Sequence, residues 1–466
     1  MQIPILSGIY ADQAPDFRTS YPRNMVPVPK VQGISNGYLR PADGIDLFGT
    51  GPGSCRGSIK WNGVLYMVMG PSLVRVDRDG TVVELGAVGG TGHVTMDYSF
   101  DCLSIACDGR LFYWDGVALT SVTDPDIGTV IDQLWVDGYF MTTDGEYLIV
   151  TELNDRYSVN PLKYGSSEVD PDPVWSLLKV RNEVYVLNRH TIEVFDNVGG
   201  ENFPFQRIDG AQVPRGVIGT QACCLFAETI AFLGSGRNEA PSVYLVASGS
   251  AGKIATAEIE TILKGYTEQQ LSEVVLEARA DKAHQQMLMH LPDQTWVYDA
   301  AASATIGEPV WFSLTTSVVG PGTYKARNFC WCYDQWIAGD PTSSRIGVMN
   351  SNISTHYGET IGWDFGTLML YNASRGALIF ELEMVVLPGR VQFGKNPVIW
   401  TSYSLDGQTW SQEFPKAAGK QGERLKRIAW RRQGKFRNYR IQRFRGTSDA
   451  HVAVARLEAQ LEPLAA

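Results

Sequence analysis

The chain has 466 residues, of which 44% are hydrophobic, 11% are aromatic and 19% are charged. This composition supplies enough apolar material for a large core and too little charge for an intrinsically disordered protein. The net charge of −10 excludes a protein whose whole surface wraps nucleic acid. The length fits two or three domains at about 150 residues each.

The first 50 residues contain six prolines and little hydrophobic periodicity. Because proline fixes extended backbone, this pattern is typical of an arm that lies across another surface. We expect residues 1–50 to be an interface element that does not fold alone. Its apolar and aromatic anchors would be Tyr21, Met25, Val26, Val28 and Tyr38.

Short strands separated by tight turns dominate residues 51–355. Eight Asp-Gly and two Asn-Gly dipeptides occur in the chain, and both residues of such a pair tolerate the positive φ of a hairpin turn. The strand cores begin near Leu65, Leu111, Tyr147, Val184, Ile230, Met287 and Gln335. A drifting period of about 40–50 residues predicts a β-propeller of six or seven irregular blades. The alternative is a series of unrelated meanders in two β-sandwiches.

Helical patterns are rare, and the best candidate covers residues 256–275, where Thr267–Gln270 reads as a capping box. After about residue 355 the predicted strands become longer. They cover residues 368–371, 377–386, 398–404 and 439–444. We therefore predict an all-β protein in which a C-terminal β-sandwich spans residues 356–466.

The motifs that suggest catalysis or metal binding each lack a required part. Residues 247–254 resemble a P-loop, but Ala247 replaces the first glycine and Ile254 replaces the magnesium-binding hydroxyl residue. The six histidines and seven cysteines do not have the spacing of a closed zinc site. We expect free, buried thiols of a reducing compartment, and no signal peptide, membrane insertion, enzymatic activity, metal or cofactor.

Several stretches, in this order along the chain, are similar to one phage family. They are Tyr21–Lys30 with Gly37–Pro41 and Gly44–Ile45, Ala240–Val246 with Ile254–Glu260 and Gly265–Thr267, Leu291–Pro292 with Val297–Ala300, and the arginine-rich Trp430–Arg445. Together they resemble the packaged-DNA stabilisation protein of short-tailed podovirus phages, also called the tail accessory factor, tail hub or tail nozzle.

This resemblance implies a late structural virion protein that forms a homohexameric ring below the portal and its adaptor ring. The ring would extend the channel for viral double-stranded DNA, retain packaged DNA until genome ejection, and anchor the tail needle and the tailspikes or tail fibres. It would assemble in the host cytoplasm and end in the virion tail. The alternative is a propeller-plus-sandwich protein that cleaves or binds carbohydrate, because Ser404–Trp410 resembles the Asp-box turn of sialidase propellers.

A basic stretch, residues 416–446, holds twelve Lys and Arg residues against the single acidic residue Glu423. We interpret Phe436–Arg445 within it as one strand that a partner covers, because neither of its faces is cleanly apolar. The candidate contact residues are Arg424, Lys426, Arg427, Arg431, Arg432, Lys435, Arg437, Arg440, Arg443 and Arg445.

Three interpretations of this basic stretch stay open: a solvated face, a protein interface and a DNA contact. Arginine suits planar contacts to both carboxylates and phosphates. We favour an interface with an acidic protein, because six such stretches lining a channel would hold DNA too tightly for ejection.

Overall fold

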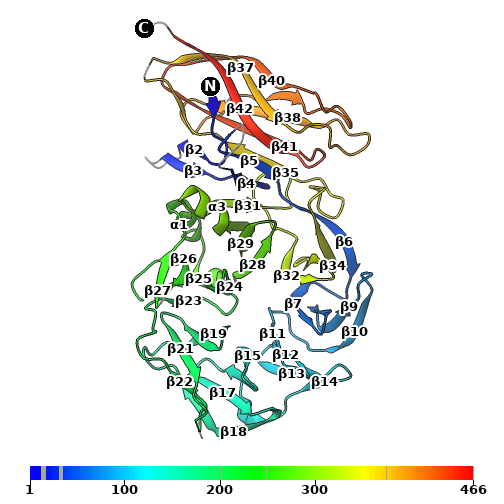
Figure 1. The fold of residues 1–466 in the computed structure, drawn as a ribbon, viewed down its shortest axis with the longest axis vertical. Coiled ribbons are helices and arrows are strands. Elements are labelled where there is room, and N and C mark those ends of the chain that lie inside the picture. The colour runs from blue at the N-terminus through cyan, green and yellow to red at the C-terminus, as the bar shows by residue number, and fades with distance from the viewer. Residues whose placement is uncertain (12–16, 31–34, 201, 248, 374, 465–466) are drawn as a thin grey trace.

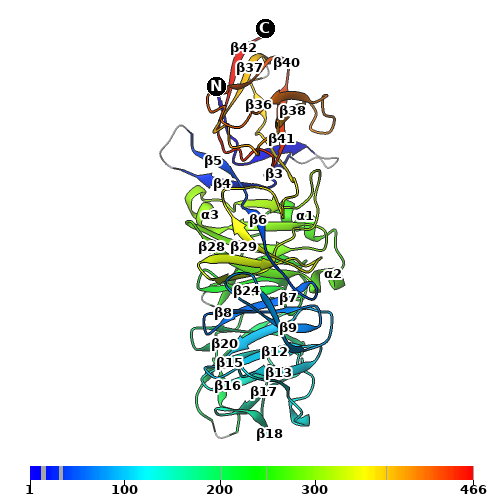
Figure 2. The same ribbon diagram turned by 90° about the vertical axis from the view of Figure 1, so that its right-hand side faces the viewer.

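The computed structural model describes residues 1–11, 17–30, 35–200, 202–247, 249–373 and 375–464. A β-propeller and a β-sandwich follow one another along the long axis of the molecule, and strands from the N-terminal segment lie between them (Figures 1 and 2). The prediction of an all-β propeller with a C-terminal sandwich is therefore confirmed.

The propeller has seven blades, each an antiparallel sheet within the described chain. The first blade consists of β7 (Cys55–Trp61), β8 (Val64–Met69), β9 (Ser72–Val76) and β10 (Val82–Ala87), and the second of β11 (Thr95–Tyr98), β12 (Leu103–Cys107), β13 (Arg110–Trp114) and β14 (Leu119–Ser121). The third blade consists of β15 (Asp132–Val136), β16 (Tyr139–Thr143), β17 (Tyr147–Glu152) and β18 (Asp155–Ser166), and the fourth of β19 (Val174–Val180), β20 (Glu183–Asn188), β21 (Ile192–Asn197) and β22 (Phe205–Arg207).

The last three blades carry the insertions and the ring closure. The fifth blade consists of β23 (Gly216–Val217), β24 (Cys223–Phe226), β25 (Thr229–Ser235), β26 (Ser242–Ala247) and β27 (Ser250–Lys253). The sixth consists of β28 (Val275–Asp281), β29 (His284–His290), β30 (Thr295–Asp299) and β31 (Trp311–Leu314). The seventh consists of β32 (Arg327–Cys332), β33 (Gln335–Gly339), β34 (Arg345–Asn350) and β6 (Gly44–Thr50). The innermost strands β7, β11, β15, β19, β24, β28 and β32 contact one another in this order around the axis.

Each of the seven strand cores expected from the sequence lies in a different blade. The cores at Leu111 and Tyr147 fall on the third strand of their blades and the others on the second, so their spacing drifts. At Asn62–Gly63 and Asp108–Gly109 both residues have positive φ, as the turn chemistry requires. The sequence predicted six or seven blades, and the structure has seven within the described residues.

The seventh blade is closed by β6, which the sequence pattern places in the N-terminal arm. β6 pairs with β34 in antiparallel register from Gly44↔Asn350 to Thr50↔Arg345. A Cβ on Gly80 would lie only 1.9 Å from the carbonyl oxygen of Phe48, so the β9–β10 turn of the first blade also packs against β6. The expectation that all of residues 1–50 form a separate arm is wrong in this part, because β6 is needed as the fourth and outermost strand that completes the seventh blade.

The sandwich also draws strands from the N-terminal segment. One sheet contains β1 (Gln2–Ile3), β4 (Met25–Pro29), β5 (Gly37–Pro41), β42 (Val454–Pro463), β37 (Ala377–Val386) and β40 (Ile428–Phe436). The other sheet contains β35 (Gly362–Gly366), β36 (Leu370–Tyr371), β38 (Val398–Ser404), β39 (Phe414–Ala417) and β41 (Tyr439–Thr447). Leu382, Trp430 and Phe444 belong to the core cluster of this domain. The bounds predicted for β37 and β38 agree with the structure.

Between the two domains, Arg23 and Asn24 make polar contacts to both. The Arg23 Nε donates to Asp364 in the sandwich over 2.6 Å, and its Nη1 donates to the carbonyl of Gly320. The Asn24 amide donates to the carbonyl oxygens of Thr315 and Gly362. A separate hairpin, β2 (Gly8–Ala11) and β3 (Phe17–Ser20), contacts the sandwich through β35.

Over the residues that the structure describes, three short α-helices and one 3₁₀ turn interrupt the strands: α1 (Ala257–Leu263), α2 (Glu268–Ser272), α3 (Ala300–Ile306) and η1 (Pro125–Ile127). The predicted capping box is present, because the Thr267 hydroxyl accepts from the Gln270 amide and the Gln270 side chain accepts from Thr267 in return. α1 and α2 follow one another in the chain between β27 of the fifth blade and β28 of the sixth (Figure 2).

Candidate functional site

The basic stretch is divided between the two sheets of the sandwich. β40 belongs to the sheet of β37, whereas β41 pairs with β35, β36 and β38. The chain changes sheets at Arg437 and Asn438. The interpretation of Phe436–Arg445 as a single strand is therefore wrong. Its mixed faces arise because the segment contributes to two sheets, which local alternation alone does not show.

Several of the basic side chains are neutralised inside the chain by carboxylates outside residues 416–446. Arg427 bonds Glu381 and Glu383 on the neighbouring strand β37, and Arg431 lies directly opposite Glu381 with Nε 3.0 Å from its carboxylate. Further ion pairs join Arg443 to Asp364 and Arg445 to Glu413, and within the stretch itself Lys426 pairs with Glu423. The alternating glutamates of the predicted strand 377–386 were the sequence signal for this pairing.

Arg440 is a core residue and not a contact residue. Its side chain is fully buried, its guanidinium carbon lies 3.8 Å from the ring centroid of Tyr403, and it donates to Gln442 and to the carbonyl of Gln433. Burial lowers the pKa of Arg440 to about 10. The prediction that Arg440 meets a partner or DNA is wrong, because stacking on an aromatic ring and internal hydrogen bonds hold it inside the sandwich.

Four of the ten candidate contact residues are exposed and form no ion pair within the described part of the chain. We call Arg424, Arg432, Lys435 and Arg437 the exposed cations. Arg432 has a φ of 54° at a break in the β37–β40 register, so a β-bulge displaces it from the regular ladder. Leu425, beside Arg424, is 98% exposed. These residues, not the whole stretch, are the candidate contact surface.

The expected arm anchors contact this chain itself. Met25 and Val26 are buried, and Val28 and Tyr38 are half-buried in β4 and β5. Tyr21 packs edge-on against Trp296 with ring centroids 5.8 Å apart. Its hydroxyl lies 2.6 Å from the Thr256 hydroxyl, and burial raises its pKa. The prediction that these residues serve as free anchors for a partner is wrong for Tyr21, Met25 and Val26, because intramolecular packing already covers them.

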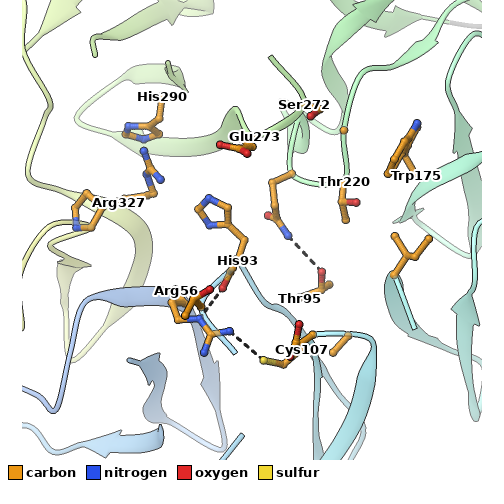
Figure 3. Close-up of a pocket in the computed structure, with 18 of the residues that line it drawn as sticks. Arg56, His93, Thr95, Cys107, Trp175, Thr220, Ser272, Glu273, His290 and Arg327 are labelled. Carbon is orange, nitrogen blue, oxygen red and sulfur yellow. Dashed lines mark hydrogen bonds between the residues drawn. The ribbon is translucent and has the colours of Figure 1, made fainter. Parts of the chain in front are cut away.

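A cavity of about 910 Å³ lies on the propeller axis, and residues of all seven blades line it. Figure 3 shows the side chains of His93, Glu273 and Arg327 around it. Arg56 lies at its wall, where its guanidinium donates to the carbonyls of Gly70, Gly89 and Gly92. This polar cavity has no counterpart in the motifs considered from the sequence, because its residues come together only when the ring closes.

The histidines considered as metal ligands form hydrogen bonds within the chain, and the cysteines are free thiols. His284 bonds Asp299, and His290 bonds Glu277 and Thr295. Over the described residues, no group of three His, Cys, Asp or Glu side chains could hold a metal ion. All seven cysteines are free, and five of them are buried, including Cys332; Cys330 is half-buried.

The Asp406 turn is held by its own hydrogen bonds. The Asp406 carboxylate accepts from the backbone amides of Gln408 and Thr409 over 2.9 and 2.7 Å, and these bonds together with the Thr409 hydroxyl lower its pKa. Trp410 is 38% exposed. Among the described residues, no helix is long and apolar enough to cross a membrane.

The structure thus defines a two-domain, all-β protein of the propeller-plus-sandwich class. The family described as Bacteriophage P22 Gp10, beta-propeller, matches residues 1–354, and Bacteriophage P22 Gp10, beta-sandwich, matches residues 362–462. The chain belongs to the bacteriophage P22 Gp10 family.

A relative of known identity covers the whole chain. The tail hub protein gp10 of Salmonella phage P22 is 27% identical over 483 aligned positions, which cover 99% of both chains. This protein is therefore a homologue of a phage tail hub protein, which confirms the resemblance seen in the sequence.

Solved structures resemble the propeller more distantly. The Pan2 WD40 domain of Neurospora crassa aligns with a TM-score of 0.41 and 10% identity over 66% of this chain and 96% of its own. BamB from Moraxella catarrhalis aligns with a TM-score of 0.37 and 14% identity over 75% of this chain and 99% of its own. At these scores we base no argument on them.

Proposed function

We propose that this protein is the tail hub of a short-tailed phage, a structural component without enzymatic activity. Six copies form a ring below the portal and adaptor ring and extend the channel for double-stranded DNA. The ring retains the packaged genome and provides attachment for the tail needle and the tailspikes or tail fibres. It is assembled in the host cytoplasm and becomes part of the virion tail.

The observation that carries this proposal is the full-length correspondence with the tail hub protein gp10 of Salmonella phage P22, through both domains in the same order. A ring-closed propeller joined to the sandwich by the N-terminal segment, which supplies β6 to the propeller and β4 and β5 to the sandwich, also supports a rigid structural role. The carbohydrate alternative has no observation of comparable weight, because the Asp406 turn is accounted for by its internal hydrogen bonds.

The exposed cations are the part of the surface that we assign to a protein partner. Residues 356–466 carry sixteen Lys and Arg against ten Asp and Glu, whereas residues 1–355 carry 24 against 40. A basic sandwich and an acidic propeller are complementary, so the acidic surface of a neighbouring subunit or of the adaptor fits the exposed cations. DNA contact is the competing interpretation of the same residues.

Genetic removal of the protein tests the proposed role. A phage with a nonsense codon early in this gene, grown in a non-suppressing host, should make heads that package DNA but lose it and lack complete tails. A plasmid copy of the wild-type gene should restore full particles, and DNA retention is measured by nuclease sensitivity of purified heads. Fully infectious particles without the protein would contradict the proposal.

A further inference from the structure

The Arg327 guanidinium in the axial cavity has no partner of opposite charge. Arg327 forms no ion pair within the described residues, and its Nε is buried without a hydrogen-bond partner. Burial lowers the pKa of Arg327 relative to a free arginine. Arg327 is half-buried. A cation that is partly removed from water without a paired anion or full hydrogen bonding loses solvation, so this guanidinium is suited to bind an anion.

The carboxylates near Arg327 do not fill this role. Glu277 accepts from His290 Nε2 over 2.6 Å and from the backbone amides of Phe329 and Asn328 over 2.8 and 3.2 Å. These bonds orient Glu277 towards the blade backbone, with no contact to Arg327 within 4.0 Å. Glu273, which also lines the cavity, is an exposed side chain and likewise makes no ion pair with Arg327.

His93 offers a second donor to the same space. Its ring has no hydrogen-bond partner among the described residues, and Figure 3 shows it beside Arg327 and above Arg56. Burial and, after it, the positive charges of Arg327, His290 and Arg56 together lower the pKa of His93 to about 4, against the opposing charge of Glu277. At neutral pH His93 is therefore an uncharged imidazole with one N–H to donate.

We propose that Arg327 and His93 form a binding site for a small oxyanion of the phosphate class in the axial cavity of the propeller. A guanidinium presents a planar fork that matches two oxygens of a phosphate, and the imidazole N–H serves a third. The volume of about 910 Å³ admits either free phosphate or a phosphomonoester. The site belongs to the single chain and does not depend on the proposed assembly.

The pKa of His93 reports occupation of this site directly. Protein labelled with ¹³C at histidine Cε1 is titrated by NMR in potassium phosphate and in potassium chloride of equal ionic strength, and the His93 signal is assigned from its absence in His93→Gln. Bound phosphate should raise the pKa of His93 by about 1 to 3, because an opposite charge within about 4–6 Å favours the protonated ring. Arg327→Met should abolish the rise, whereas the matched control Arg424→Met on the sandwich surface should keep it.

A His93 pKa that is unchanged in both inorganic phosphate and glycerol 2-phosphate, or an equal rise in wild type and Arg327→Met, would overturn the proposal. The other histidine signals show whether each variant is folded. If Arg327→Met does not fold, Arg327→Lys replaces it: the charge stays but the planar fork is lost, so phosphate should bind at least about tenfold more weakly. Equal affinity in Arg327→Lys would also count against the site. A rise with glycerol 2-phosphate but none with inorganic phosphate would identify a phosphomonoester as the ligand and support the site.

Discussion

The Asn350 side chain donates a hydrogen bond from Nδ2 to Oδ2 of Asp46 over 2.7 Å, although the two residues are 304 positions apart in the chain. This contact joins β34 to β6 and so connects the end of the propeller sequence to its beginning. β6 thereby supplies the fourth and outermost strand of the last blade, and the N-terminal segment becomes part of the body of the protein.

Loss of packing by β6 should destabilise the whole propeller. Ile45 is fully buried in β6, so Ile45→Ala should lower the free energy of unfolding of the propeller by about 2–5 kcal/mol. Leu47 on the same strand is 59% exposed, so Leu47→Ala should change the free energy of unfolding by less than about 0.5 kcal/mol. Urea unfolding followed by tryptophan fluorescence measures both. Equal effects of the two substitutions would mean that β6 does not close the ring in solution.

Reversing three exposed cations should block assembly without unfolding the sandwich. The combined variant Arg424→Glu, Arg432→Glu and Lys435→Glu changes side chains that are exposed and form no ion pair in the described structure. We expect the free energy of unfolding to change by less than about 1 kcal/mol and the affinity for the adaptor to fall about tenfold or more. Sedimentation with purified portal–adaptor complexes measures the second effect.

The matched control for this variant reverses three exposed propeller cations that form no ion pair within the described chain, Lys60, Arg181 and Lys264, and should leave adaptor binding intact. Arg440 is unsuitable for such a test, because Arg440→Glu would place a carboxylate in the sandwich core. If the sandwich variant assembles normally but its particles lose DNA, the exposed cations contact DNA instead of protein.

Acid should destabilise the protein partly through His356. This side chain is fully buried, its Nδ1 lies 2.9 Å from the Thr316 hydroxyl, and its Nε2 has no partner. Burial, aided by the positive charge of Lys325, lowers the pKa of His356 to about 3. The neutral form is favoured in the folded state, so its contribution is complete above about pH 6.5 and is lost as the pH falls towards 3.

The comparison of wild type with His356→Asn isolates this contribution. From pH 7 to pH 5 the wild type should lose about 2 kcal/mol more unfolding free energy than the variant, because only its unfolded state takes up the extra proton. The Asn amide can retain the bond to Thr316. Parallel pH profiles for the two proteins would show that His356 is not buried as a neutral ring.

The thiols should react slowly in the folded protein. Burial raises the pKa of Cys223 and Cys330 to about 12 and that of Cys55 to about 11, and only the thiolate attacks a disulfide reagent. At pH 8 we expect these three to be labelled by 5,5′-dithiobis(2-nitrobenzoate) only over hours. In guanidinium without reductant, all seven cysteines should be labelled; fewer than seven adducts would reveal a disulfide that contradicts the free thiols.

Local patterns predicted the elements of this fold well. The turn pairs Asn62–Gly63 and Asp108–Gly109 and the strands β37 and β38 depend on neighbouring residues, so the sequence places them correctly. The pairing of β6 with β34 depends on residues about 300 positions apart, and no local pattern contains it. Proline-rich composition suggested an arm, but β4 carries Pro27 and Pro29 within a sheet of the sandwich.

The candidate site was predicted less well for a similar reason. Counting charges in residues 416–446 overlooked Glu381 and Glu383, which only strand pairing brings beside Arg427 and Arg431. Burial of Arg440 under Tyr403 depends on the packing of two sheets. The family resemblance was independent of these contacts, because it depended on the order of several stretches along the whole chain.

Native mass spectrometry of the purified protein, alone and mixed with the portal–adaptor complex of its phage, tests the central claim most directly. Within the described chain no coiled coil or disulfide fixes an oligomeric state, so the isolated protein should be mostly monomeric. The adaptor should then bind six copies, since a ring template raises the effective concentration of neighbouring subunits. A stable isolated dimer that does not bind the adaptor would contradict the proposed tail hub.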